Sequence, residues 1–294
     1  MSDIKLAKAL TLTYLTPVSF ASLNGSDKEA DNISSIKKIS AGMEQYPYVS
    51  AQAVRRALRD QLAVLGGKLS EGAKSSTDKG AATTQCNPAD FIDDDLFGFM
   101  NAQKVEKGGT NKRTSAVRVS PLIALNHYQG DLDFGTNYMG VEAGGDPNIF
   151  ETEIHSGLYR GTILIELDRV GSGDGFKNDL DPKEKAARVK VLMAAVKNLW
   201  TSGRQSRFLA DISPKFVAAA LLKVKNPIFL ECVQTQEKAL NKEMLAETVK
   251  DYDKEIISHV FGVRQGFFTD APAGSKSIGE AFDDISSWID AHYA

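Results

Sequence analysis

The chain has 294 residues, of which 42% are hydrophobic and 25% charged, a composition typical of globular proteins with one large domain or two. This composition excludes wholesale disorder, a collagen-like repeat and a disulfide scaffold, because two cysteines form one disulfide at most. The net charge of −3 argues against nonspecific nucleic-acid binding by the whole surface but leaves a local basic groove open. No apolar run approaches the roughly 20 residues of a membrane span. Charged residues interrupt any signal-peptide core at the start, so we expect a cytoplasmic protein that contacts no membrane.

The first part of the chain contains one predicted strand and one predicted helix. Alternating apolar residues predict a strand over 4–15, which Pro17 ends. A polar segment over 18–48 follows, and so long a connection is usually functional or disordered. Ser50 is the predicted N-cap of an amphipathic helix that a pair of glycines ends. The small polar residues at 66–84 then predict a flexible loop.

Strands and helices alternate irregularly in the rest of the chain. The predicted elements are, in order, a strand at 117–119, an irregular Gly-, Asn- and Tyr-rich stretch over 126–160, a strand at 161–170, a helix capped by Asp181, short strands within 206–233, a helix over 236–250 and a last helix capped by Ser277. This order predicts an α+β fold, in which helices cover a sheet, rather than a strict βαβ repetition.

The common catalytic and cofactor motifs are missing from the sequence. The glycines between 171 and 175 lack the G-x-G-x-x-G spacing of a dinucleotide loop, and there is neither a P-loop nor a G-x-S-x-G elbow. Neither cysteine belongs to a C-x-x-C pair, so a structural zinc site is not expected. His127 and His155 are candidate bases for RNA cleavage, although single histidines are more often structural. We therefore expect no cofactor and no metal ion.

Three carboxylates lie close together in the polar segment. Asp27, Glu29 and Asp31 span five residues and are candidates to hold a divalent metal beside a phosphodiester. The alternative is a solvated acidic loop, which we favour because Lys28 lies among the acids.

The helix that begins after Ser50 carries the clearest pattern for nucleic-acid binding. Gln52, Arg55 and Arg59 are spaced i, i+3, i+7 and so share one face, while Arg56 lies further around the helix. A helix N-terminus offers free N–H groups and a positive dipole end, and arginines one turn apart can bracket successive phosphates. The alternative is an ordinary solvated helix face.

A second basic cluster lies between residues 104 and 118. It contains Lys104, Lys107, Lys112, Arg113 and Arg118 against a single acid. Nearby glycines give the segment freedom to close over a phosphate backbone as a basic arm, and a merely soluble loop is the equal alternative.

Several short motifs, in order along the chain, resemble one known family. They are YLTPVSF at 14–20, LNGSDKEA at 23–30, YPYVS at 46–50, RRALRD at 55–60, DLFGFM at 95–100, RVSPL at 118–122 and HSGLYRG at 155–161. Together they resemble the DevR-type autoregulator family of CRISPR-associated proteins, which supplies the repeated backbone subunit of the type I-B Cascade surveillance complex. The resemblance is good from residue 4 to about 170 and loose in the last third.

This resemblance implies a fold and a function. The fold is a single hand-shaped domain over 1–294, with an RRM-like (ferredoxin-like) core, a finger insertion at about 66–95 and a thumb insertion at about 101–160. The implied function is non-catalytic: the subunit forms a filament along the CRISPR RNA (crRNA) and holds its backbone, so that the bases can pair with target DNA. The implied partners are crRNA, target DNA through that RNA, copies of the same chain, and the large, small and crRNA-end-binding subunits of Cascade.

The resemblance and the basic patterns together predict the RNA contacts. The candidate residues are Lys28, Lys37, Lys38, Ser50, Gln52, Arg55, Arg56, Arg59, Lys112 and Arg113.

Two other hypotheses stay open. One is a metal-dependent ribonuclease of the same fold that uses Asp27 and Asp31, and the other is a regulator that binds duplex DNA. A further hypothesis concerns the acidic last helix, which we expect to meet the basic side of a neighbouring copy through four carboxylates. These are Glu280, Asp283, Asp284 and Asp290.

Overall fold

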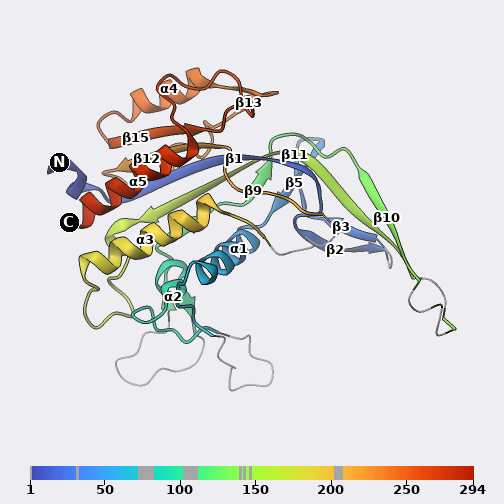
Figure 1. Cartoon of the computed structure of the whole chain (residues 1–294), viewed down its shortest axis with the longest axis horizontal. Helices are drawn as coiled ribbons and strands as arrows, with labels where there is room; N and C mark the ends of the chain where they lie inside the picture. Colours follow the sequence, from blue (N-terminus) through green and yellow to red (C-terminus); the bar gives the residue numbers. More distant parts are fainter. Residues whose placement is uncertain are drawn as a thin grey trace.

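An antiparallel sheet of five strands forms the centre of the computed structural model (Figure 1). Its strands are β15 (Ile256–Val263), β12 (Phe216–Leu222), β1 (Ala9–Ala21), β11 (Asn148–Glu166) and β8 (Val117–Val119), side by side in that order. The structure describes residues 2–30, 33–71, 83–101, 112–138, 141, 144–145, 148–201 and 208–294. The α+β class predicted from the sequence is confirmed, with a large antiparallel sheet.

Strand β1 is longer than predicted and begins later. A 3-10 helix, η1 (Ser2–Leu6), occupies the start of the predicted strand, and β1 continues past Pro17 to Ala21. The prediction that Pro17 ends the strand is wrong because β12 pairs with β1 only as far as Leu15. At Pro17 the strand has β11 on one side and no described strand on the other, a position where a missing N–H is tolerated.

Three helices cover one face of the sheet. They are α1 (Ala51–Val64), α3 (Pro182–Lys197) and α5 (Ile278–Tyr293), with α3 between the other two (Figure 1). The predicted N-caps are confirmed: Ser50, Asp181 and Ser277 each accept a hydrogen bond from a backbone N–H in the first turn of their helix. The apolar stripes of these helices pack on Leu10, Leu12, Ile163 and Ile165 of the sheet to form the main core. In the part of the chain that the structure describes, no helix has the length and apolarity needed to cross a membrane.

Residues after β12 cover part of the opposite face. They form the hairpin of β13 (Thr235–Gln236) and β14 (Ala239–Leu240), then α4 (Lys242–Asp251), over a second apolar cluster that includes Phe216, Phe229 and Phe261. The predicted helix at 236–250 therefore starts six residues late. Of the strands predicted within 206–233, only β12 forms in the described part, 208–233, and β15 is a strand that the sequence did not predict.

A long β arm projects from the body of the molecule (Figure 1). The arm consists of the outer half of β11, paired with β10 (Asp131–Asn137) and with the hairpin of β2 (Gly25–Ala30) and β3 (Ile33–Ile36). At its base lie β4 (Lys38–Ala41), β5 (Glu44–Val49) and β9 (Leu122–Ala124). The sequence predicted a polar connection over 18–48 and an irregular stretch over 126–160, and both predictions are wrong because these segments contain the strands of the arm. Buried residues follow one another along the arm, as Ser35 and Ile36 do in β3 and Thr152 and Glu153 in β11, while β10 is mostly exposed. These strands therefore lack the alternation that burial of one face produces.

A short helix, α2 (Ile92–Phe97), lies beneath the helix layer and is followed by β6 (Phe99–Met100) and β7 (Lys112–Arg113). Its three consecutive acids, Asp93 to Asp95, are all buried. Gly98 makes the turn from α2 into β6 at φ +70°, and a Cβ there would lie 2.2 Å from the carbonyl oxygen of Arg113. Most of the predicted flexible loop at 66–84, and Lys104 and Lys107 of the second basic cluster, lie outside the described residues.

Candidate nucleic-acid interface

The start of α1 is held against the two ends of the β2–β3 hairpin by one asparagine. The Asn24 side-chain oxygen accepts a hydrogen bond from the Ser50 N–H at 2.9 Å, and its carbonyl oxygen accepts one from the Lys37 N–H, also at 2.9 Å. The Tyr48 N–H in turn donates to the Lys37 carbonyl. This chain of bonds places Lys37, which is half-buried, beside the N-terminal end of α1.

The first two turns of α1 present polar and basic side chains to solvent. Gln52 and Arg56 are exposed, and Arg56 forms an ion pair with Asp60 at 2.9 Å across one helical turn. Exposed pairs of this kind contribute little stability, so the Arg56 guanidinium can exchange Asp60 for a phosphate at small cost.

Arg55 is the least satisfied of the arginines on this helix. Its side chain is half-buried, and its Nε atom is buried with no hydrogen-bond partner among the described residues. Burial lowers the pKa of the Arg55 guanidinium, and repulsion from Arg118 lowers it further. A buried donor without an acceptor costs free energy. An anion beside Arg55 would offer an acceptor and would offset the repulsion from Arg118.

Arg59, on the same helix face, is instead paired inside the protein. Its guanidinium forms a 2.6 Å ion pair with Asp93 of α2, and the Arg59 side chain is 30% exposed while that of Asp93 is fully buried. Ser70 also contacts both residues, since its N–H donates to Asp93 and its carbonyl accepts from Arg59 at 3.4 Å. A phosphate at Arg59 would have to displace a buried carboxylate, so this position does not fit the predicted RNA contact.

The candidate lysines of the polar segment have separate surroundings. Lys38 turns away from α1 toward the base of the arm, where its ammonium contacts both carboxylate oxygens of Glu153 at 2.7 and 2.9 Å and lies 4.4 Å from the centre of the Tyr128 ring. The Glu153 carboxylate also accepts from the Ile36 N–H. Lys38 is therefore committed to an internal pair, and the side chain of Lys28 lies outside the described residues.

The two residues of β7 face opposite ways. Lys112 is exposed, whereas Arg113 is buried and forms a 2.6 Å ion pair with the buried Asp95. Arg113 also donates to three carbonyl groups of the loop that follows β11, those of Arg169, Ser172 and Asp174. With every nitrogen engaged inside the protein, Arg113 does not fit the predicted RNA contact.

The structure thus divides the predicted site residues into three groups. Lys37, Ser50, Gln52, Arg55 and Arg56 gather at the open end of α1, and we call this group the α1 platform. The second group, in internal pairs, consists of Lys38, Arg59 and Arg113. Lys112 stands alone on β7.

Two groups of candidate catalytic residues can also be placed. His155 is buried, with its ring nitrogens bonded to the Tyr159 hydroxyl at 2.9 Å and the Asn126 amide at 3.1 Å, and burial lowers its pKa. This is a structural histidine, whereas His127 is exposed. The Asp27 side chain and all of Asp31 lie outside the described residues, within which no three His, Cys, Asp or Glu side chains come together as a metal site.

The acids of the last helix are mostly engaged within the chain. Glu280 accepts from Ser277 in the capping box of α5, Asp284 pairs with Lys276 at 2.5 Å, and Asp290 pairs with Lys190 at 2.6 Å. These pairs weaken the basis for the hypothesis that α5 is a free acidic surface for a neighbouring copy.

One charged group went unnoticed in the sequence because its members come from distant segments. On the face of the sheet opposite the helices, the Glu166 carboxylate accepts from Arg118 at 2.7 Å and Lys225 at 3.0 Å. These three residues line a hollow of about 420 Å³ whose floor includes Thr162 and Leu164. Only Arg118 belonged to a basic cluster in the sequence.

Comparison with known proteins gives consistent matches. A family model described as "CRISPR-associated negative auto-regulator DevR/Csa2" matches residues 15–243. A protein of Myxococcus xanthus (strain DK1622), "CRISPR-associated protein Cas7/Cst2/DevR", is 26% identical over 249 residues, which are 79% of this chain and 78% of the relative.

Two solved structures have the same fold. One is described as "CRISPR RNA-guided surveillance complex, pre-nicking", and a chain of it matches with a TM-score of 0.62 and 14% identity, over 95% of this chain and 99% of that one. The other, "CRISPR RNA-guided surveillance complex", matches with a TM-score of 0.60 and 15% identity, over 95% and 98%.

Proposed function

We propose that this chain, which belongs to the DevR/Csa2 family of CRISPR-associated proteins, is a Cas7-type backbone subunit of a type I-B Cascade complex. In this role it binds crRNA along the phosphate backbone and leaves the bases free to pair with target DNA. Its other partners are further copies of the chain, with which it forms a filament, and the large, small and crRNA-end-binding subunits. It works in the cytoplasm and carries out no chemistry itself.

The strand order supports the RRM-like part of this proposal. Along the chain the central elements run β1, α1, β8, β11, α3, β12, and in the sheet the four strands lie in the order β12-β1-β11-β8, all antiparallel. This is the β-α-β-β-α-β arrangement of a ferredoxin-like core. The arm and the connections beneath the helix layer, both inserted between these elements, correspond to the thumb and finger of a hand.

The observation that carries the proposal is the α1 platform in a chain of this family. Arg55 combines an unpartnered buried donor with a repelling neighbour, Arg118, and so favours an anion. Gln52, one turn before Arg55 on α1, and Lys37, beside the N-terminal end of the helix, can hold adjacent phosphates. None of these groups reads a base edge, which fits a protein that must hold any spacer sequence.

The experiment is RNA binding by the purified chain, measured by fluorescence anisotropy on unrelated RNA sequences over a range of salt. Arg55→Ala should weaken binding of every sequence alike and lower the slope of log K against log salt by about one. Lys254→Ala is the matched control, since Lys254 is an exposed cation at the end of α4, on the other face of the sheet. Arg55→Lys should restore part of the binding.

Three results would contradict the proposal. Loss confined to particular sequences would mean that the platform reads bases. Tighter binding of duplex DNA than of RNA would favour a DNA-binding regulator, in keeping with the words "negative auto-regulator" in the family description. Metal-dependent cleavage of a paired RNA, abolished by Asp31→Ala, would make the protein a ribonuclease.

A further inference from the structure

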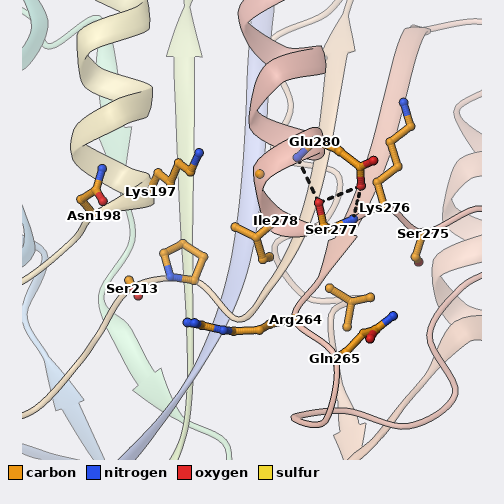
Figure 2. A pocket seen from close by; sticks show the side chains of 13 residues that line it. Lys197, Asn198, Ser213, Arg264, Gln265, Ser275, Lys276, Ser277, Ile278 and Glu280 are labelled. Carbon is orange, nitrogen blue, oxygen red and sulfur yellow. Dashed lines mark hydrogen bonds between the residues drawn. The ribbon is translucent and has the colours of Figure 1, made fainter.

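A hollow on the helix face of the sheet is large enough for a ligand and takes no part in the α1 platform. It has a volume of about 740 Å³ and lies between the end of α3, the start of α5 and the loop at Ser213 (Figure 2). A second hollow of about 390 Å³ adjoins it, and both are lined by Lys197, Asn198 and Ser213. The volume of the larger one falls within the range of ligand pockets. We call the two hollows together the α3–α5 groove.

Two cations extend into this groove from opposite walls. In Figure 2 Lys197 extends from the end of α3 toward α5, and Arg264 extends from the end of β15 toward Ser213. Neither pairs with a carboxylate among the described residues. The Lys197 ammonium lies 6.0 Å from the centre of the Phe282 ring. Two like charges in one pocket, neither of them in an ion pair, favour an anionic ligand.

The acids that line the groove do not compete for these cations. Glu280 accepts hydrogen bonds from the N–H and hydroxyl of Ser277, at 2.9 and 2.7 Å. Asp211 accepts from the N–H of Ser213 at 2.8 Å and pairs with Lys215 at 2.7 Å. Because Ser277 and Glu280 also close the N-terminus of α5, the anion-binding groups of the groove are the two side chains and not the helix end.

The adjoining hollow adds an aromatic surface. Trp200 and Leu209 line it with exposed fractions of 40% and 77%, which are high for large apolar side chains. An exposed indole ring within a basic groove is the combination by which proteins hold single-stranded nucleic acid, with a base against the ring and phosphates against the cations.

We propose that the α3–α5 groove binds a single-stranded nucleic acid, with phosphates at Lys197 and Arg264 and a base stacked on Trp200. Figure 1 supports a path for such a strand, because the start of α1, the end of α3 and the start of α5 lie at the same end of the helix layer. A strand held at the α1 platform can therefore continue into the groove. An acidic protein segment would match the cations but would leave the indole ring without a planar partner. The inference goes beyond the proposed function, since it assigns a second contact surface.

The test uses the intrinsic fluorescence of the groove. The chain has two tryptophans, and Trp288→Phe leaves Trp200 as the only one while keeping an aromatic ring in the half-buried place of Trp288. This variant is titrated with a single-stranded RNA of about 15 nucleotides, the upper range of site sizes for such grooves. We expect the RNA to quench Trp200. Arg264→Ala in the same background should weaken the titration about tenfold, as expected for the loss of one charged hydrogen bond, and lower its salt slope by about one. Lys254→Ala should change neither.

The possible outcomes separate this inference from the proposed function. If the RNA binds by anisotropy and Arg55→Ala weakens it, but Trp200 is not quenched and Arg264→Ala has no effect, the groove proposal is overturned and the proposed function stands. If no RNA binds, both are overturned. Quenching by polyglutamate but not by RNA would assign the groove to an acidic protein partner and overturn the nucleic-acid assignment. Arg264→Lys should keep most of the affinity, which separates lost charge from a misfolded groove.

Discussion

Replacing Asp95 by asparagine removes the one negative charge that two buried arginines share. The Asp95 carboxylate lies 2.6 Å from Arg113 and 2.8 Å from Arg188, and both of its oxygens accept from the Gly171 N–H. The side chains of Asp95 and Arg113 are fully buried, and that of Arg188 is 6% exposed. The contact joins α2, β7, α3 and the loop after β11.

The size of the effect follows from this burial. Removing one member of a buried ion pair costs about 3–5 kcal/mol, because the partner is left as an uncompensated buried charge. Unfolding a chain of 294 residues has an entropy of roughly 0.6 kcal/mol/K. Asp95→Asn should therefore lower Tm by about 5–8 °C.

Thermal unfolding followed by circular dichroism measures this shift, with Asp90→Asn as the control. Asp90 is exposed, and its carboxylate accepts a side-chain hydrogen bond only from Asn87 among the described residues. We expect the control to stay within about 1 °C of the wild type, since surface changes rarely exceed 0.5 kcal/mol. Equal Tm values for both variants would refute the argument that the buried Asp95 charge holds the two arginines.

Three further predictions concern other contacts. Arg59→Ala should destabilise the protein by about 1–3 kcal/mol in urea unfolding, because it leaves the buried Asp93 carboxylate without its cation. A change in RNA affinity without loss of stability would instead mean that Arg59 contacts RNA. Burial raises the pKa of the Glu166 carboxyl, but hydrogen bonds from Lys225 and Arg118 lower it by more, so its net shift is downward. Its contribution is therefore present above the unfolded pKa and lost as pH falls through the folded one. Glu166→Gln should cost about 1 kcal/mol at pH 7, and this cost should shrink as pH falls below the ordinary carboxyl pKa and through the lower folded one; a cost that stays constant into acid would contradict this. Gly98→Ala should lower the free energy of unfolding by more than about 2 kcal/mol, because at φ +70° its Cβ would clash with the Arg113 backbone. The control Gly42→Ala, at φ +63° with open space around it, should lower it by only about 1 kcal/mol. Equal losses would show that the clash at Gly98 is relieved.

Local chemistry made the starts of three helices predictable. Ser50, Asp181 and Ser277 each stand before an apolar stripe, and a cap needs only its own side chain and the N–H groups of the next turn. The strand predicted at 161–170 was equally clear because one of its faces meets the helices, but it ends at Glu166, where a 3-10 helix begins.

The arm could not be predicted in the same way. The outer half of β11 has consecutive buried residues, Thr152 and Glu153, so no alternation marks it, and its pairing with β3 joins residues 118 positions apart at Glu151 and Ile33. The edge strand β15 lacks clean alternation too, because its burial changes along its length rather than from face to face.

The basic residues show a different limit of the sequence. Arg55 and Arg59 share one helix face and cannot be distinguished in the sequence. In the structure, Arg55 has a donor without a partner among the described residues, whereas Arg59 pairs with a buried carboxylate. The difference comes from α2, where Asp93 to Asp95 are flanked by Phe91, Ile92, Leu96 and Phe97. Acids enclosed by apolar residues on so short a helix indicate buried carboxylates that need internal cations, and this signal was available in the sequence.

Strand β11 belongs both to the arm, where it pairs with β10 and β3, and to the centre of the sheet, where it pairs with β1 and β8. Its 19 residues span about 63 Å at the rise of a β-strand, and they pair in turn with β10, β3, β1, β9 and β8. The length of β11 therefore sets how far the arm extends from the sheet, because its inner half is fixed next to β1. Adding a single residue between the arm and the core would turn every side chain beyond it to the opposite face, whereas adding two would move the tip outward by about 7 Å and keep each face as it was. Evolution can therefore lengthen or shorten this reach only in even steps, unless a bulge absorbs the odd residue.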